Sequence, residues 1–253
     1  QVTDVHGCTA LDTITITQPD QLIAIATVQP TKCNGSADGT VSISVSGGTP
    51  AYVYMWSVPG ISGSSGNLLP AGNYAALITD DHGCNVVINA VVTQPVALSL
   101  NTGSVSASCN GYADGVAFAS ATGGTGNIGF VWPQYALTGD SLFGLTAGSY
   151  AVVATDLHGC SISSSILISE PSPLQLVATS DTLACYGNSN GTLQASATGG
   201  NGGYTFSWTP GNFNGALITN LSQGQYQVTA QDVKGCSITH IAEVISPAPL
   251  NLN

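Results

Sequence analysis

The sequence predicts an all-β fold made of tandem antiparallel β-sandwich domains, each about 76 residues long. The 253 residues include 31 glycines and one methionine. Small and β-prone residues dominate, which suits short strands joined by tight turns and suits helices poorly. The same landmarks also return every 76 residues without an insertion, which is the mark of a repeat protein. The landmarks are Cys8, Cys84, Cys160 and Cys236; Cys33, Cys109 and Cys185; Trp56, Trp132 and Trp208; Tyr74, Tyr150 and Tyr226; and Pro19, Pro95, Pro171 and Pro247.

These landmarks divide the chain into three whole repeats between two partial ones. Residues 20–95, 96–171 and 172–247 are predicted as repeats 1, 2 and 3. Residues 1–19 match the C-terminal part of a preceding repeat, and residues 248–253 match the start of a following one. We therefore expect the native polypeptide to be longer. A uniform repeat length implies the same rotation at every junction, and so an extended rod.

Alternating apolar residues define the strands of a repeat. Residues 40–46 place Val41, Ile43 and Val45 on one face, as a strand beside a core requires. The pair Gly47–Gly48 follows and supplies the positive φ angles of a turn. Further strands are predicted over residues 21–27, 52–56, 74–79 and 85–93.

Two aromatic positions indicate which kind of sandwich forms. The segment from Leu69 to Tyr74 reads Leu-Pro-Ala-Gly-Asn-Tyr just before the penultimate strand, as in the tyrosine corner of immunoglobulin-like domains. Trp56 on the third strand fits the buried tryptophan of the same fold. Each repeat is therefore predicted to be an immunoglobulin-like sandwich.

The charge excludes several classes of function. The chain has thirteen acidic residues and only two basic ones, Lys32 and Lys234, so its net charge is −11. Nucleic acids and anionic membranes both require a basic surface, so neither is an expected partner. No apolar run approaches the roughly 18 residues of a spanning helix, so no membrane insertion is expected. No catalytic constellation of nucleophile and base is present, and we expect no enzyme activity.

Four segments carry a resemblance to a known family. They are Cys33–Gly39, Gly47–Trp56, Leu69–Tyr74 and Thr79–Cys84, together with their counterparts in repeats 2 and 3. Together they resemble the SprB-type repeat of giant cell-surface proteins in gliding and other Bacteroidota. Asn190 and Lys234 are small departures from the pattern. The resemblance implies an extracellular adhesin or filament exported by the type IX secretion system.

The predicted function is therefore a structural and adhesive repeat segment that provides reach and multivalent attachment. Its expected partners are neighbouring repeats of the same chain, other copies in a filament, and surface or polysaccharide ligands. One alternative is an array of carbohydrate-binding modules, tested at Tyr52 and Tyr204. Another is a self-assembling filament in which the strand around residues 10–17 completes the sheet of a neighbour.

The seven cysteines predict disulfides, since small secreted domains often need them. We expect one bond within each repeat: Cys33–Cys84, Cys109–Cys160 and Cys185–Cys236. Cys8 would then pair upstream. The spacing also permits bonds between repeats, such as Cys84–Cys109 or Cys33–Cys160. No Cys-x-x-Cys motif or histidine cluster favours a metal site.

No cofactor is expected, with calcium as the one candidate considered. Calcium needs six to eight oxygen ligands, and acidic residues lie near the glycine-rich turns. The residues considered are Asp38, Asp80, Asp81 and Asp114. Aspartate also favours such turns by bonding its own backbone. His6, His82 and His158 share one turn position and are expected to face solvent.

Three Asp-Ser/Thr-aliphatic triplets resemble the O-glycosylation motif of exported Bacteroidota proteins. The modified residues would be Thr13, Ser141 and Thr182. The triplets do not follow the 76-residue step, so the fold does not require them. Glycans there would help to solubilise a surface with few charges.

Overall fold

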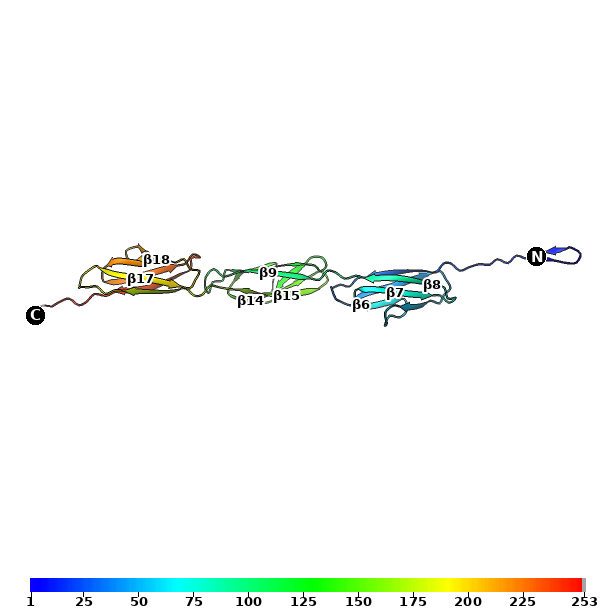
Figure 1. Ribbon diagram of the computed structural model, residues 1–253, viewed down its shortest axis with the longest axis horizontal. Coiled ribbons are helices and arrows are strands. Elements are labelled where there is room, and N and C mark those ends of the chain that lie inside the picture. The colour runs from blue at the N-terminus through cyan, green and yellow to red at the C-terminus, as the bar shows by residue number, and fades with distance from the viewer. Residues whose placement is uncertain (252–253) are drawn as a thin grey trace. The chain divides into compact units, whose positions relative to one another are not determined.

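The computed structural model describes residues 1–251, whose secondary structure consists of strands alone, which confirms the all-β prediction. Within these residues, no helix is long and apolar enough to span a membrane. Each whole repeat forms its own two sheets, and no sheet in the described chain holds strands of two repeats (Figure 1). The chain forms two compact units. One holds Gln1–Leu98 with residues 123–127 and 156–160, and the other holds the rest of repeats 2 and 3.

Repeat 1 contains six strands in two three-stranded sheets. One sheet has the order β3-β4-β6 and the other the order β5-β7-β8. The strands are β3 (Ile23–Gln29), β4 (Gly39–Ser46), β5 (Val53–Trp56), β6 (Ser65–Leu69), β7 (Gly72–Thr79) and β8 (Asn85–Val92). All pairings are antiparallel.

Repeats 2 and 3 each contain seven strands, because a short fourth strand is added. In repeat 2 they are β9 (Ser99–Val105), β10 (Gly115–Thr122), β11 (Gly129–Trp132), β12 (Leu137–Thr138), β13 (Ser141–Leu145), β14 (Gly148–Thr155) and β15 (Ser161–Ile168). In repeat 3 they are β16 (Gln175–Ser180), β17 (Gly191–Thr198), β18 (Thr205–Thr209), β19 (Phe213–Asn214), β20 (Leu217–Leu221), β21 (Gly224–Gln231) and β22 (Ser237–Val244).

The strand order is that of an immunoglobulin-like sandwich. The first, second and fifth strands of repeat 2 form one sheet, in the order β13-β10-β9. The third, fourth, sixth and seventh strands form the other, in the order β12-β11-β14-β15. The short β12 pairs with the third strand, whereas in constant-type immunoglobulin domains the fourth strand joins the opposite sheet. The predicted sandwich is confirmed in each repeat.

The tyrosine corner is present three times. The hydroxyl of Tyr74 donates to the carbonyl of Pro70 at 2.8 Å, and that of Tyr150 donates to the carbonyl of Thr146 at 2.9 Å. Tyr226 repeats the bond to Ser222 at 3.1 Å. Each bond fastens the start of the penultimate strand to the loop before it, which explains why Leu-x-x-Gly-x-Tyr recurs.

The tryptophans lie in the sandwich cores, which are separate in the three repeats. Trp132 and Trp208 are buried, whereas Trp56 is half-buried. Each indole N–H donates to a glycine carbonyl seven residues later, for example from Trp208 to Gly215 at 3.0 Å. A buried indole needs such an acceptor, so the glycine-rich loop folds back over the ring.

Two strand predictions differ from the structure. Strand β6 of repeat 1, the counterpart of β13 and β20, lies in a segment that reads as a glycine- and serine-rich loop. Only Gly66 and Leu69 of it are buried, so it carries no apolar alternation. Residues 10–17 do not form the predicted strand. The short β2 (Thr9–Ala10) pairs with β1 (Val2–Thr3), in the register in which Asn85–Val86 pairs with Ile78–Thr79 in repeat 1.

Candidate functional site

Each repeat places one cysteine in a turn held by an aspartate. In repeat 3, Asp232 Oδ1 accepts the backbone N–H groups of Lys234 at 2.9 Å and Cys236 at 3.0 Å. Its Oδ2 accepts the N–H of Asn201 at 2.8 Å, from the loop after the second strand. Asp80 and Asp156 make the equivalent bonds in repeats 1 and 2. The aspartate therefore fixes the backbone that carries the cysteine.

These bonds keep the aspartates ionised. The Thr49 amide is the main reason that the pKa of Asp80 lies below its ordinary value of 3.8. Burial raises the pKa of Asp232, but the amides of Asn201, Cys236 and Lys234 outweigh it, so this pKa is also lowered. A carboxylate that accepts several N–H groups loses those bonds when it is protonated. The turn is therefore built around a charged aspartate.

This arrangement predicts a loss of stability in acid. An aspartate whose pKa is lower in the folded state stabilises the fold at every pH above its pKa in the unfolded chain, about 3.9. This stabilisation is lost as the pH falls from that value through the lower pKa of the folded state. Thermal unfolding followed by circular dichroism should show Tm falling in this range. Asp80→Asn should reduce the fall, while Asp81→Asn should leave it unchanged because the Asp81 side chain is exposed. A Tm that stays constant through this range would contradict the role given to Asp80.

The glycine pair that precedes Asn201 is required because the backbone there passes close to the Asp232 carboxylate. Gly200 has φ +55°, and a Cβ there would lie 2.6 Å from Asp232 Oδ2. Any side chain would push the carboxylate off the amides it accepts, besides straining the backbone. Gly48 and Gly124 stand in the same place, which confirms the predicted positive-φ turn.

The other cysteine of a repeat lies at the opposite end of the sandwich. Cys33 is in the loop between β3 and β4, and this loop contacts the end of β8: Thr31 N–H donates to Thr93 O, and Asn34 Nδ2 donates to Pro95 O. Cys84 immediately precedes the start of β8. Eight residues of strand separate the two ends by about 25 Å. A disulfide requires Cα atoms about 4.4–6.8 Å apart.

The disulfides therefore join successive repeats. Cys33 bonds Cys160 and Cys109 bonds Cys236, each with a Cα–Cα distance of 5.7 Å and a sequence separation of 127 residues. The predicted pairs Cys33–Cys84, Cys109–Cys160 and Cys185–Cys236 are wrong, because topology places the members of each pair at opposite ends of one sandwich. Cys33–Cys160 was among the alternatives that the spacing permits. Within the described chain, Cys8, Cys84 and Cys185 are unpaired and exposed.

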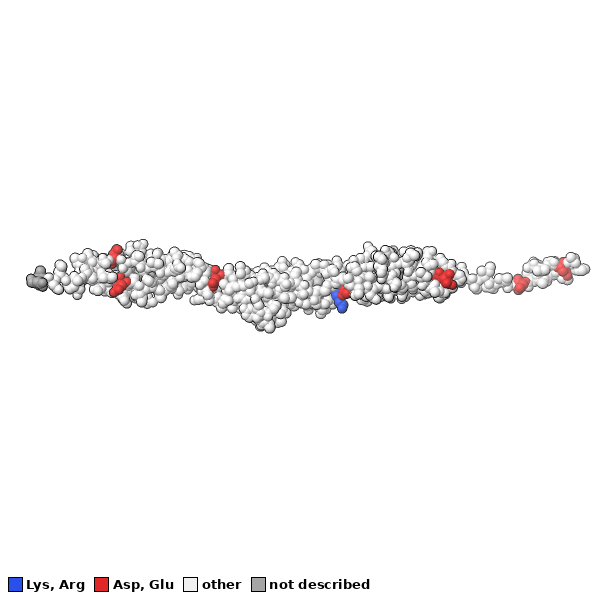
Figure 2. Space-filling model, turned by 90° about the horizontal axis from the view of Figure 1, so that it is seen from below, with Lys and Arg blue, Asp and Glu red and all other residues white. Residues whose placement is uncertain are grey.

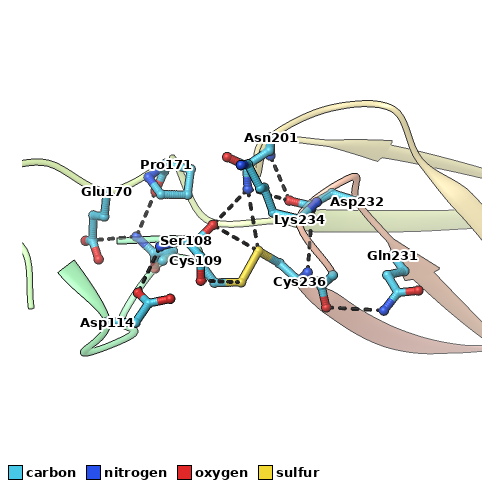
Figure 3. Close-up of a disulfide and its surroundings, with 12 residues drawn as sticks. Ser108, Cys109, Asp114, Glu170, Pro171, Asn201, Gln231, Asp232, Lys234 and Cys236 are labelled. Carbon is cyan, nitrogen blue, oxygen red and sulfur yellow. Dashed lines mark hydrogen bonds between the residues drawn. A yellow bond between two sulfur atoms is a disulfide. The ribbon is translucent and has the colours of Figure 1, made fainter. Parts of the chain in front are cut away.

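Polar contacts surround the bond between Cys109 and Cys236 (Figure 3). Asn201 Nδ2 from repeat 3 donates to Ser108 O of repeat 2 at 2.9 Å, and Cys236 Sγ lies 3.3 Å from the same oxygen. Ser108 N–H in turn donates to Asp114 Oδ1 at 2.9 Å. The backbone next to Cys109 is thus held from both repeats.

The aspartates considered for calcium are engaged in the turns. Asp38 Oδ1 accepts the Ser36 hydroxyl at 2.6 Å and the Lys32 N–H at 3.1 Å, and Asp114 has the comparable bond to Ser108. In residues 1–251, no group of three or more His, Cys, Asp or Glu side chains is placed to hold a metal ion. His6, His82 and His158 are exposed. The local role of aspartate in turns accounts for Asp38 and Asp114.

The triplets proposed for glycosylation differ in accessibility. Thr13 and Thr182 are exposed. Ser141 is half-buried in β13, and its hydroxyl donates to Asp140 Oδ1 at 3.0 Å. Thr13 and Thr182 are therefore the more accessible acceptors, and modification stays a prediction at all three.

Sequence comparison identifies the repeats. The family model described as the SprB repeat matches residues 25–60 and 177–213. The chain contains SprB-type repeats. The matches fall in repeats 1 and 3, and repeat 2 has the same cysteine, tryptophan and tyrosine spacing and the same fold. No curated protein matches the chain.

Several solved structures resemble the SprB-type chain at low identity. A Dpr2 Ig1-Ig2 complex with DIP-Theta Ig1-Ig3 is 10% identical over 90% of this chain and 100% of that chain, with a TM-score of 0.31. Extracellular domains 3-5 of Drosophila OTK are 12% identical, covering 90% and 92%, with a TM-score of 0.29. Fibronectin(III)-like modules of Clostridium thermocellum CbhA are 15% identical, covering 59% and 93%, with a TM-score of 0.25. Our fold assignment rests on strand pairing and the tyrosine corners.

Proposed function

We propose that this chain is a structural and adhesive segment of a long extracellular surface protein, which provides reach and multivalent attachment. The observation that carries the proposal is the pair of disulfides that joins successive SprB-type repeats. Such a protein would be exported to the surface of a gliding or related bacterium by type IX secretion, as the resemblance implies.

The covalent arrangement suits a protein that carries tension. Successive repeats are connected twice, once by the polypeptide linker and once by a disulfide. Two connections between successive repeats restrict their relative rotation more than a single linker would. A pulling force then passes from one repeat to the next through both connections. Disulfides persist in oxidising surroundings such as the cell exterior and are rare in the cytosol, which supports an extracellular location.

The surface suits many weak contacts better than one strong electrostatic contact. Charged residues make up only 6% of the chain, and Figure 2 shows wide areas of one face without them. Identical or similar contacts repeated along one molecule raise the overall avidity without any new contact in each repeat. The repeat number, more than any one site, would then determine how firmly the protein attaches.

Carbohydrate binding through Tyr52 and Tyr204 is less well supported. The hydroxyl groups of Tyr52 and Tyr204 donate to the carbonyls of Gly47 and Gly199 at 2.7 and 2.6 Å. Both rings are half-buried, and Ile128 takes their place in repeat 2. Their position is explained by the turn that they close.

Assembly by strand exchange is the other alternative, in which a sheet that lacks its last strand binds residues 10–17 of another copy. Deleting residues 1–19 should abolish such association between copies, as sedimentation would show.

Attachment in shear flow tests the main proposal. Beads that carry the oxidised chain should stay on glass or agarose at shear that removes beads carrying the urea-denatured, alkylated chain. The shear needed for detachment should rise more steeply than linearly with the density of chains, as multivalent binding requires. Equal detachment of the native and denatured beads at every density would contradict an adhesive role.

A further inference from the structure

The two disulfides between repeats differ in their access to solvent. Cys109 and Cys236 are buried, at 5% and 7% exposed, whereas Cys33 and Cys160 are both half-buried. The two bonds join equivalent positions, and each lies between two whole repeats. The difference in exposure therefore comes from the residues around each bond. Below, Cys109–Cys236 is called the buried bond and Cys33–Cys160 the half-buried bond.

An asparagine side chain lies against the buried bond (Figure 3). Asn201 Nδ2 donates to Cys236 Sγ at 3.5 Å. The same amide donates to Ser108 O and to Asp232 Oδ2, both at 2.9 Å. The equivalent residue at the half-buried bond is Thr125. Threonine has a single hydroxyl donor and no amide, so it cannot reproduce this set of contacts.

A tyrosine also lies beside the buried bond. Tyr112 lines a small hollow together with Cys109 and Cys236. Its counterpart next to Cys33 is Ser36. A serine side chain shields much less of its surroundings than a tyrosine ring does, so solvent reaches the half-buried bond more easily. Access is one of the factors that determine how fast a thiol attacks a disulfide.

The only two residues among lysines and arginines in this chain stand beside these disulfides. Lys32 precedes Cys33, and its carbonyl oxygen lies 3.4 Å from Cys160 Sγ. Lys234 lies two residues before Cys236 in the same turn. A nearby ammonium group favours the thiolate that leaves when a disulfide is attacked. Because both bonds have this feature, access to solvent decides which of them reacts.

We propose that Cys33–Cys160 is a redox modification site, which reacts with small thiols of the glutathione class while Cys109–Cys236 stays intact. Reduction leaves repeats 1 and 2 connected by the polypeptide linker alone, whereas repeats 2 and 3 keep both connections. The chain thus contains one junction whose freedom of rotation depends on the thiols around it. This inference goes beyond the proposed function and does not depend on adhesion.

The reaction is a thiol–disulfide exchange. The thiolate of a small thiol attacks Cys160 Sγ, the disulfide bond breaks, and Cys33 leaves as a thiolate beside Lys32. A second small thiolate attacks the small-molecule sulfur of the mixed disulfide and releases the Cys160 thiolate. One protein disulfide is reduced to two thiolates, and two small thiolates are oxidised to one small-molecule disulfide.

Limited reduction of the oxidised full chain tests this proposal. The three unpaired cysteines of the described chain are first blocked with N-ethylmaleimide. Glutathione is then added, samples are quenched with iodoacetamide over time, and peptides are mapped by mass spectrometry without further reduction. We expect Cys33 and Cys160 to be modified about tenfold faster than Cys109 and Cys236, since the buried bond reacts only after local opening.

Two variants exchange residues that differ between the junctions. Asn201→Thr/Tyr112→Ser gives the buried bond the neighbours of the half-buried one, and its modification should become about tenfold faster. Lys32→Ser should slow modification of the half-buried bond about threefold at low salt and less at high salt, because salt screens the lysine charge. The three replaced residues are exposed, so the sandwich cores are unchanged.

Unfolding the chain in urea provides the control. There neither bond is buried, so the tenfold difference in rate should disappear. Equal rates for the two bonds in native buffer would overturn the proposal, and so would faster modification of the buried bond. An unchanged rate for the buried bond in the Asn201→Thr/Tyr112→Ser variant would show that these side chains do not protect it. Each result can be obtained whether or not the chain attaches to surfaces.

Discussion

Loss of one inter-repeat disulfide should lengthen the fully stretched chain only slightly, whereas loss of both should lengthen it severalfold more. The two bonds overlap in sequence, because Cys109 lies between Cys33 and Cys160. Tension on the oxidised chain passes from Cys33 to Cys160, backward through repeat 2 to Cys109, and across to Cys236. Only about 100 of the 253 residues are then extended, for a length of about 360 Å instead of about 900 Å.

Single-molecule pulling on cysteine variants measures this directly. Cys33→Ser or Cys109→Ser alone should add only about 25 residues, or about 90 Å, since the remaining bond still bypasses most of the chain. The double variant should add about 150 residues, or about 540 Å. Cys84→Ser and Cys185→Ser are the matched controls, and they should add nothing because both cysteines are unpaired.

Bonds within repeats would give a different pattern in the same experiment. Cys84→Ser would then lengthen the chain by about 50 residues, and the effects of single losses would add. The total extension of the unmodified chain is nearly the same for both arrangements, so only the variants distinguish them. An added length for Cys84→Ser would show that the inter-repeat arrangement is incorrect.

Replacing Trp208 with alanine should destabilise repeat 3 by about 3–5 kcal/mol, the usual range for removal of a fully buried tryptophan. The Trp208 side chain is 0% exposed and belongs to the core with Leu193, Val228 and Val244. The substitution also leaves the Gly215 carbonyl without the indole N–H that it accepts. Hydrogen exchange of amides in β21 and β22 measures the change in repeat 3 separately from the other repeats.

Trp56→Ala is the matched control in repeat 1. The Trp56 ring is half-buried, although its N–H makes the same bond, to Gly63 at 3.0 Å. We expect a smaller loss of stability there, because less apolar surface returns to water. Equal losses at the two positions would mean that burial of the ring does not determine its contribution.

The fold could be predicted because its determinants are local and repeated. Val41 and Ile43 alternate with polar residues on β4 and are buried. Tyr74 follows Leu-x-x-Gly and donates to Pro70, as the tyrosine corner requires. The strand β6 could not be predicted in the same way, because its pairing to β4 uses backbone groups and only two of its residues are buried.

The disulfide pairing could not be read from the spacing. Both sets of cysteines follow the same 76-residue step, so bonds within a repeat and bonds between repeats are equally regular in sequence. The deciding fact is that Cys33 lies at the end of the sandwich where β8 finishes, while Cys84 lies where β8 begins. Strand order alone could have indicated this, since Pro95 ends the last strand and the loop after the first strand lies at that same end.

The role of the turn aspartates was also hidden. Asp80 was considered as a calcium ligand or a turn-forming residue, and Asp156 and Asp232 were not singled out. Their bonds to Thr49, Thr125 and Asn201 reach a loop about 30 residues away and link the two sheets of a repeat. A long-range bond of this kind leaves no local pattern other than the glycine pair that makes room for it.

Non-reducing peptide mapping by mass spectrometry tests the central claim most directly. Proteolysis of the oxidised chain, with free thiols alkylated beforehand, should yield cross-linked peptides that contain Cys33 with Cys160 and Cys109 with Cys236. Cys8, Cys84 and Cys185 should be recovered alkylated from the monomer. Recovery of Cys33 linked to Cys84, or of Cys109 linked to Cys160, would contradict the claim that disulfides join one SprB-type repeat to the next.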